Sequence, residues 1–235
     1  MSPDVLHAVV FWLPAFLFSA TVHEAAHAWA ALRLGDPTAW LGGQVSLSPW
    51  PHLRRAPIGM IVVPLVTAFT QGWTLGWATT PYDRAWAEAH PRRAALMSLA
   101  GPLANLAIAA VCFGAIQAGL AWGAFEPALK PDLLHLVSNA MPPDALLAGD
   151  FVAKGLSVLL SLNVLLFMFN LLPLPPLDGA SVFTLLLPVQ AARRWRSAVA
   201  EPGVAFIGLL AAWQMFPLFA APVLISLARA ITALP

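Results

Sequence analysis

The sequence is short of charged residues and of cysteine. Only 10% of its 235 residues are charged, whereas 60% are hydrophobic. A soluble domain carries roughly 25% charged and 45–50% apolar residues, so an ordinary soluble globule is excluded. The net charge of +1 argues against nucleic acid as a partner, because no basic surface is present to displace its counterions. The single cysteine, Cys112, excludes an internal disulfide framework and lies in an apolar run typical of a buried small side chain.

The sequence contains several long apolar runs. A spanning helix needs about 20 apolar residues. Four runs are long enough to be spans: Val5–Leu34, Ala94–Phe125, Gly155–Leu177 and Gly203–Ala228. The first is interpreted as a retained membrane segment, because the N-terminus lacks the basic region and cleavage site of a signal peptide.

Two further runs do not fit a simple span. Ala56–Tyr82 is uncharged but interrupted by glycines and prolines, and Ala180–Ala192 is too short to cross comfortably. We therefore predict an all-α polytopic membrane protein with about six membrane helical segments, of which four are spans and two are re-entrant, interfacial or spanning. The absence of a soluble stretch predicts a single integral-membrane domain over residues 1–235.

The segment after the first run carries turn and strand signals. Gly35 can adopt positive φ and Pro37 cannot continue a helix, so the first helix is predicted to stop here. Apolar and polar residues alternate within Ala39–Pro49, which predicts a short strand or hairpin. Such a strand could hold an unwound substrate by edge pairing, and a plain connecting hairpin is the equal alternative.

Basic residues set the expected orientation. Arginines flank the apolar runs, and the positive-inside rule places such clusters in the cytoplasm. The clusters are Arg33, Arg54, Arg55, Arg84, Arg92, Arg93, Arg193, Arg194 and Arg196. All of them share one side only if Ala56–Tyr82 is re-entrant and Ala180–Ala192 is interfacial. We expect an integral protein of a bacterial inner membrane whose polar site lies toward the cytoplasmic side.

The stretch H-E-A-A-H at 23–27 is the strongest chemical signal. On a helix, His23 and His27 lie one turn apart on the same face, and both imidazoles can reach one zinc ion. Glu24 can lie beside the metal without binding it and act on a water molecule. Polar residues that pair with other helices are the alternative. Composition alone gives this pattern by chance in roughly 1 chain in 400 of this length, which favours zinc.

A catalytic zinc ion usually has three protein ligands, so a third group must come from elsewhere in the chain. Asp178 is the best candidate. It follows L-P-L-P-P-L, where the prolines force the backbone to unwind at membrane depth. Unwound backbone is tolerated there only when protein or a wet cavity surrounds it. A helix-capping aspartate at the interface is the alternative role.

Three motifs together resemble the site-2 proteases, a family of intramembrane zinc metalloproteases. They are H-E-A-A-H in the first half, S-L-A-G-P-L-A-N at 98–105 and N-L-L-P-L-P-P-L-D-G at 170–179, in the family's order. The resemblance covers about Thr21 to Gly203 and implies the short branch of the family without inserted PDZ or CBS regions.

The resemblance also implies roles for individual residues. It implies Zn²⁺ ligation by His23, His27 and Asp178, with Glu24 as general base. Asn170 matches an asparagine expected near the substrate or the tetrahedral intermediate. Asn105 matches a middle-helix position, where an interhelical hydrogen bond is the alternative to a direct role.

Several positions depart from the family pattern. Residues 42–59 resemble the family's G-R-L-T-L-N-P…H-I-D-P-I-G stretch but lack its arginine, asparagine and aspartate. G-W-A-T-T-P-Y at 76–82 lacks a lysine, and Ala180-Ser181 replaces the common Gly-Arg. Because the ligands and the base are intact, substrate choice rather than chemistry is expected to differ.

The sequence therefore predicts a zinc metalloendopeptidase that cleaves a transmembrane protein or peptide within the lipid bilayer. Two other functions remain open. In a transporter, the same ionisable residues would form an ion or proton relay, but no paired half-repeats are found. In an inactive scaffold of the same fold, the ligands and base would have no reason to be intact.

Overall fold

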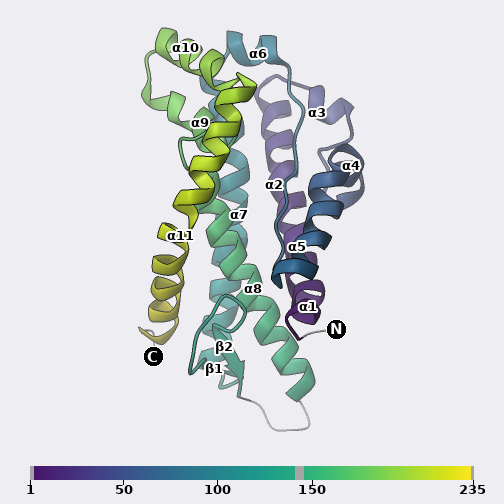
Figure 1. The fold of residues 1–235 in the computed structure, drawn as a ribbon, viewed down its shortest axis with the longest axis vertical. Helices are drawn as coiled ribbons and strands as arrows, with labels where there is room; N and C mark the ends of the chain where they lie inside the picture. The colour runs from purple at the N-terminus through teal and green to yellow at the C-terminus, as the bar shows by residue number, and fades with distance from the viewer. Residues whose placement is uncertain (1–2, 141–145, 234–235) are drawn as a thin grey trace.

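The computed structural model describes residues 3–140 and 146–233, which form an elongated helical bundle (Figure 1). The helices are α1 (Pro3–His7), a π-helical turn (Ala8–Trp12), α2 (Leu13–Leu34), α3 (Thr38–Leu41), α4 (Pro49–Arg55), a second π-helical turn (Ile58–Val62), α5 (Val63–Gln71), α6 (Arg84–Ala89), α7 (Pro91–Ala121), α8 (Leu146–Asn170), α9 (Asp178–Val182), a 3₁₀ turn (Phe183–Leu186), α10 (Val189–Val199) and α11 (Pro202–Ala233). The strands are β1 (Phe125–Pro127) and β2 (Val137–Asn139).

Among the described residues, three continuous helical stretches are long enough and apolar enough to cross a membrane. They are Val5–Leu34, Pro91–Ala121 and Gly149–Asn170. They confirm three of the four expected spans. The count rises to five if each of two bent helix pairs is taken as one span. The fourth expected span, Gly203–Ala228, lies within α11, which carries two internal prolines and follows α10 at a bend of 87°.

The first helix stops where the sequence predicts. Gly35 adopts the left-handed conformation with φ of 104°, which a residue with a β carbon rarely adopts. The amide of Asp36 then donates to the carbonyl of Ala31 at 2.8 Å, which closes the helix end.

The ambiguous segment Ala56–Tyr82 turns back toward the end of the bundle from which it starts, and we refer to it as the re-entrant segment. Its helix descends along the bundle to Gly72, whose φ is 72°, and the chain then returns in extended form to α6 (Figure 1). The amide of Trp77 donates to the carbonyl of Gly59 at 3.0 Å, and the amide of Leu75 donates to Thr67 Oγ1 at 2.9 Å. These bonds hold the extended returning segment against the helix that precedes it.

The second ambiguous segment, Ala180–Ala192, is not one continuous helix. It breaks into α9, a 3₁₀ turn and the start of α10. The end of α2, α6, the start of α7 and α10 all lie at one end of the bundle, whereas α1 and the end of α11 lie at the other (Figure 1). Seven of the nine flanking arginines belong to these elements, and the other two, Arg54 and Arg55, end α4.

The strand expected within Ala39–Pro49 is not formed, and that prediction is wrong. Local side-chain bonds take its place: the amide of Ser48 donates to Ser46 Oγ at 3.1 Å, and Ser48 then caps α4 by accepting from the amide of Trp50. Serine followed by proline is a helix-start signal, and short polar side chains that bond their own backbone compete with strands. Among the described residues the strands are β1 and β2, which follow α7 and pair antiparallel. Residues 141–145, between β2 and α8, lie outside the described part.

Helix α7 is the centre of the bundle and packs against both α2 and α8. Its buried face consists mostly of small residues at helical spacing: Ala94, Ala95, Ser98, Gly101, Asn105, Ala109 and Cys112. Small side chains let helix backbones approach closely in a membrane. The expected burial of Cys112 is confirmed.

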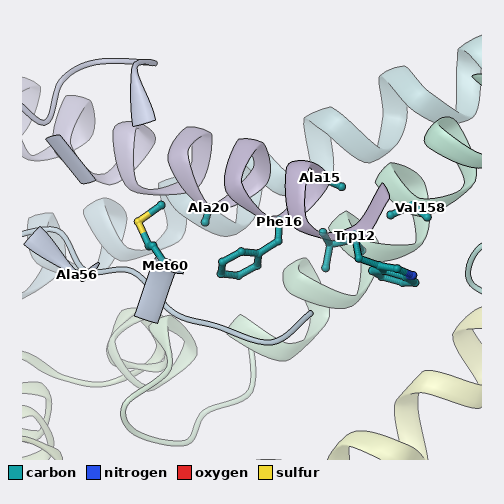
Figure 2. Packing of buried hydrophobic residues seen from close by; sticks show 8 residues of the cluster. Trp12, Ala15, Phe16, Ala20, Ala56, Met60 and Val158 are labelled. Carbon is teal, nitrogen blue, oxygen red and sulfur yellow. The ribbon is translucent and has the colours of Figure 1, made fainter. Parts of the chain in front are cut away.

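A second packing cluster joins α2, α8 and the re-entrant segment (Figure 2). Trp12 and Phe16 of the first span pack with Met60 and Val158, and Met60 and Val158 are fully buried. Dispersion contacts of this kind hold the start of the re-entrant segment against α2. Trp73 and Ala78 of the extended return pack against the same cluster, so the return is held beside the first span.

Candidate metal centre

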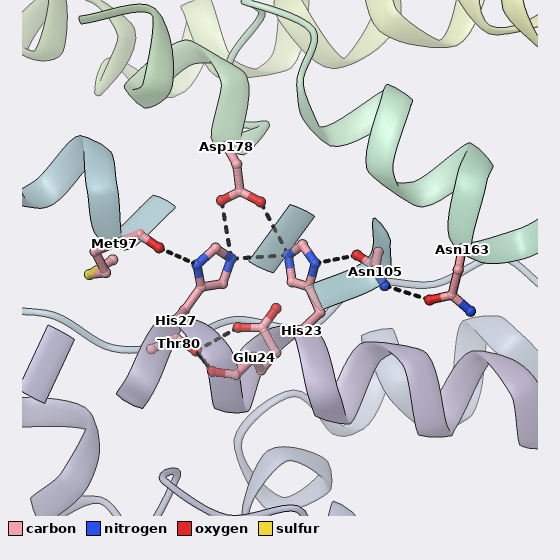
Figure 3. A network of polar contacts seen from close by, with 8 residues as sticks. All are labelled: His23, Glu24, His27, Thr80, Met97, Asn105, Asn163 and Asp178. Carbon is pink, nitrogen blue, oxygen red and sulfur yellow. Dashed lines mark hydrogen bonds and ion pairs between the residues drawn. The ribbon is translucent and has the colours of Figure 1, made fainter. Parts of the chain in front are cut away.

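His23 and His27 lie on the face of α2 that is turned toward α7 (Figure 3). Their Nε2 atoms are 3.0 Å apart, and the two side chains belong to residues only 8% and 5% exposed. The spacing of one helical turn explains the geometry, because residues i and i+4 share a face.

Asp178 reaches the two histidines from the opposite side of the site. Its Oδ2 lies 3.1 Å from His23 Nε2, and its Oδ1 lies 3.3 Å from His27 Nε2. Helix α8 ends at Asn170, and the proline-rich turn brings the chain back so that α9 starts at Asp178. Gly179 is pressed against the carbonyls of Leu171 and Leu172, where a β carbon would collide. The turn is therefore tight, and it places the carboxylate at the depth of the histidines.

The other ring nitrogens are held by hydrogen bonds to α7. His27 Nδ1 donates to the carbonyl oxygen of Met97 at 2.8 Å, and His23 Nδ1 donates to Asn105 Oδ1 at 2.6 Å. A carbonyl oxygen can only accept, so the Nδ1 atom of His27 carries a proton. In the neutral form of each ring with its proton on Nδ1, the Nε2 lone pair points at the other histidine and at the carboxylate.

This donor set fits a zinc ion. The two Nε2 atoms and the carboxylate face one another within 3.0–3.3 Å, and with both rings neutral they offer three lone pairs to one ion. Ligand atoms at 2.0–2.1 Å from a tetrahedral zinc ion lie about 3.3 Å from one another, which matches the observed spacing. A β carbon on Gly101 would collide with Nε2 of both histidines, so glycine keeps the space between the rings and α7 open.

Glu24 lies beside this cluster and not within it. Its Oε2 accepts a hydrogen bond of 2.6 Å from the hydroxyl of Thr80, which belongs to the extended return of the re-entrant segment. Thr80 also contacts the carbonyl oxygen of Glu24 at 3.0 Å. Glu24 is 6% exposed, so this contact holds a buried carboxyl group next to the two histidines.

The structure separates the two asparagines that the sequence singles out. Asn105 is fully buried and forms the interhelical hydrogen bond given as its alternative role, and its partner on α2 is His23, one of the candidate ligands. Asn170 is the last residue of α8 and is half-buried, and its side chain has no hydrogen bond among the described residues. It lies eight residues before Asp178 in the chain, and its role in the reaction stays a prediction.

Sequence reasoning missed the residues that support the site. Thr80 and Asn163 have no local signal, because their partners are 56 and 58 residues away in the chain. Gly101 and Met97 lie in or next to the S-L-A-G-P-L-A-N motif, whose small residues point to a close approach of helices. The sequence does not show which helix comes close to these residues. The packing of α7 on α2 shows that they lie against the two histidines.

Comparison with known proteins identifies the family. The profile described as Peptidase family M50 matches residues 11–214, which covers most of the chain and all three motifs. The chain belongs to peptidase family M50. The resemblance to the site-2 proteases, which form this family, is confirmed.

Curated M50 relatives agree with this assignment. The chain is 32% identical over 194 residues to the protein named "Putative zinc metalloprotease YwhC" of Bacillus subtilis, covering 82% of this chain and 76% of that one. It is 29% identical over 170 residues to "Putative zinc metalloprotease Rip2" of Mycobacterium tuberculosis, covering 72% of this chain and 54% of that one. The chain therefore spans about half the length of Rip2. No solved structure matches the chain.

Membership of family M50 establishes the broad function. The chain is a metallopeptidase of an integral-membrane family, and its zinc metalloprotease relatives imply Zn²⁺ as the cofactor. The transporter and the inactive scaffold find no support in these relatives. The cluster of His23, His27 and Asp178 is the group of potential metal ligands found in the described residues.

Proposed function

We propose that this M50 peptidase hydrolyses peptide bonds within or near the transmembrane segments of membrane proteins. One observation carries the proposal. The cluster of His23, His27 and Asp178, with Glu24 beside it, lies inside a bundle whose long helices are apolar enough to cross a membrane. Ionisable groups at such depth are costly and mark function. A peptidase with its polar groups at this depth suits a substrate that also lies in the bilayer.

We assign zinc ligation to His23, His27 and Asp178, as an HExxH site completed by a distant aspartate. A bound zinc ion supplies Lewis-acid activation of water and of a carbonyl group. The protein supports this by bonding Nδ1 of both imidazoles, so that Nε2 is the atom turned toward the metal, and by excluding bulk solvent from a site of low exposure. The names of YwhC and Rip2 support the metal and the reaction class.

Glu24 serves as the general base in this proposal. Its carboxylate takes a proton from the attacking water as a carbon–oxygen bond forms at the scissile carbonyl. It then gives a proton to the leaving amine as the carbon–nitrogen bond breaks. Thr80 holds Oε2 in place, so that the other carboxylate oxygen is available for the proton. Asn170 is assigned to donate a hydrogen bond to the carbonyl oxygen as charge develops on it.

Substrate and location follow from the same placement. A helical transmembrane substrate must unwind locally before its scissile carbonyl is accessible, because helical hydrogen bonds occupy that carbonyl. The site lies in the half of α2 that leads to Arg33, close to the end of the bundle where the arginines gather. We therefore place the chain in a bacterial inner membrane with its site toward the cytoplasmic side.

Mapping the cleavage sites of reconstituted enzyme tests this function. Purified protein in liposomes is given a mixture of single-span membrane proteins and soluble proteins, and new termini are identified by mass spectrometry. We expect new termini within or within a few residues of transmembrane segments, with zinc present, and none with Glu24→Gln. Cleavage confined to soluble proteins or to long exposed loops contradicts the intramembrane assignment.

A further inference from the structure

A series of hydrogen-bonded, buried polar side chains leads away from the metal centre across three helices (Figure 3). It runs from His23 on α2 to Asn105 on α7 and on to Asn163 on α8, and it ends at Ser19, one helical turn before His23. Asn105, Asn163 and Ser19 are each 0% exposed. Fully buried amides in an apolar bundle need a reason beyond packing, since each must satisfy its donors and acceptors.

The direction of these hydrogen bonds is fixed at Asn163, the residue of the series on α8. The carbonyl oxygen of Leu159 lies 2.8 Å from the side-chain amide of Asn163 and can only accept. The group of Asn163 that faces it is therefore the NH₂, which also donates to Ser19 Oγ at 2.8 Å. The amide oxygen of Asn163 is left pointing the other way, toward α7.

This orientation passes to the next amide and then to the histidine. Asn163 Oδ1 accepts from Asn105 Nδ2 at 2.8 Å, so the oxygen of Asn105 faces His23. That oxygen accepts from His23 at 2.6 Å, which places the proton of the neutral ring on Nδ1. The lone pair of Nε2 then points at Asp178 and His27.

We infer that Asn163 is a positioning residue that sets the tautomer of His23 through Asn105. The inference rests on the proposed zinc ligation by His23. His27 needs no such device, because its Nδ1 faces the carbonyl of Met97, which cannot be turned. The amide of Asn105 can turn over, and the reversed amide would bond the ring with its proton on Nε2, in the direction of the metal. Asn163 makes the productive orientation the only one with both amides satisfied.

The test measures zinc affinity of the purified full chain in detergent by competition with a chromophoric chelator. Asn163→Leu keeps the branched shape at Cγ but removes the acceptor for Asn105. We expect zinc affinity to fall about tenfold, the lower end of the range for partners that orient metal-binding histidines. Asn163→Asp retains an oxygen toward Asn105 in either protonation state, although it loses an amide donor. We expect its zinc affinity to stay within twofold of wild type.

A control on the same helix separates positioning from folding. Ser157 is also fully buried on α8, and it bonds the amide of Leu136 and the carbonyl of Ala153 away from the site. Ser157→Ala is expected to lower the unfolding temperature of the zinc-free protein and leave zinc affinity unchanged. Equal zinc affinity for the wild type and Asn163→Leu overturns the inference, as does a tenfold loss with Asn163→Asp. If the leucine variant does not fold, Asn163→Ala, which also removes the acceptor for Asn105, takes its place, and equal zinc affinity for it and the wild type overturns the inference.

Failure of the proposed site gives a different result from failure of this inference. His23→Ala is measured beside the other variants. If it binds zinc as tightly as the wild type, His23 is not a ligand and the assigned centre is wrong. If His23→Ala loses zinc while Asn163→Leu does not, the centre stands and only the positioning role of Asn163 is overturned.

Discussion

The α carbon of Gly101 lies against the ring of His27, so that a β carbon at this position would overlap Nε2. The same β carbon would lie 2.6 Å from His23 Nε2. Both the backbone of α7 and the helix face of α2 are fixed by packing, so neither can yield cheaply. We expect Gly101→Ala to abolish zinc binding and peptidase activity while the chain still folds.

Gly114 offers a matched control on the same helix. Nothing lies within 4 Å of the β carbon that an alanine there would carry. Gly114→Ala should keep zinc binding and should raise stability by about 0.5–1 kcal/mol, because alanine favours the helix. The pair is compared by metal analysis and thermal unfolding. Full zinc binding by Gly101→Ala would place the metal away from α7.

Removal of the third ligand should weaken zinc binding without unfolding the chain. Asp178→Ala leaves the two histidines on α2 intact, but two ligands do not complete a catalytic zinc site. We expect zinc to be lost on dialysis against a weak chelator that the wild type withstands, and activity to be lost with it. Retention of zinc at wild-type affinity would return Asp178 to a helix-capping role.

Thr80 is expected to matter for turnover and not for the metal. Thr80→Val removes the hydroxyl that bonds Glu24 Oε2 and leaves a side chain of similar shape. A hydrogen bond to a charged group contributes about 1.5–3 kcal/mol, so we expect kcat to fall at least tenfold while zinc content stays normal. Thr79→Val, at the exposed neighbouring position, should change neither. Unchanged kcat in the Thr80 variant would mean that Glu24 is held by other contacts.

Much of the fold could be predicted because apolar runs and stop signals act locally. The length of Val5–Leu34 and the stop at Gly35 follow from hydropathy and from positive φ alone. The strand within Ala39–Pro49 could not be excluded in this way, because alternation of apolar and polar residues also occurs where Ser46 and Ser48 bond their own backbone. The pair of β1 and β2 has three residues in each strand, too short for a periodic signal.

The ligands of the candidate site were accessible from the sequence, but their supports were not. His23, Glu24 and His27 share one helical turn, so spacing alone predicts their arrangement. Asp178 could be proposed because unwound backbone at membrane depth needs a partner. Asn163 and Thr80 act through contacts between distant segments, and no local pattern identifies the partner of a buried amide or hydroxyl.

Asp36 should make the junction after α2 sensitive to acid. Its side chain is buried, which disfavours the charge, but hydrogen bonds from Thr38 and from the amide of Asp83 outweigh this and lower its pKa. A lowered pKa means that the stabilisation is present above the unfolded value of 3.8 and is lost as the pH falls through the folded pKa. We therefore expect the wild type to lose stability as the pH falls below the unfolded value of 3.8.

Asp36→Asn removes this acid dependence. An asparagine cannot accept from both Thr38 and the amide of Asp83, since one of its two groups is a donor. We expect a loss of about 1–3 kcal/mol at neutral pH and a flatter dependence of stability on pH between 2 and 5, as measured by unfolding in detergent. Parallel pH curves for the two proteins would show that Asp36 is not the group that titrates.

Paired metal analysis and cleavage by the wild type and Glu24→Gln test the assigned chemistry most directly. Glutamine keeps the size of Glu24 and its contact with Thr80 but cannot take a proton from water. We expect about one zinc ion per chain in both proteins, as for a single three-ligand site, and cleavage of a transmembrane substrate by the wild type alone. Full cleavage by the Gln variant, or active wild-type enzyme without bound zinc, would contradict the account.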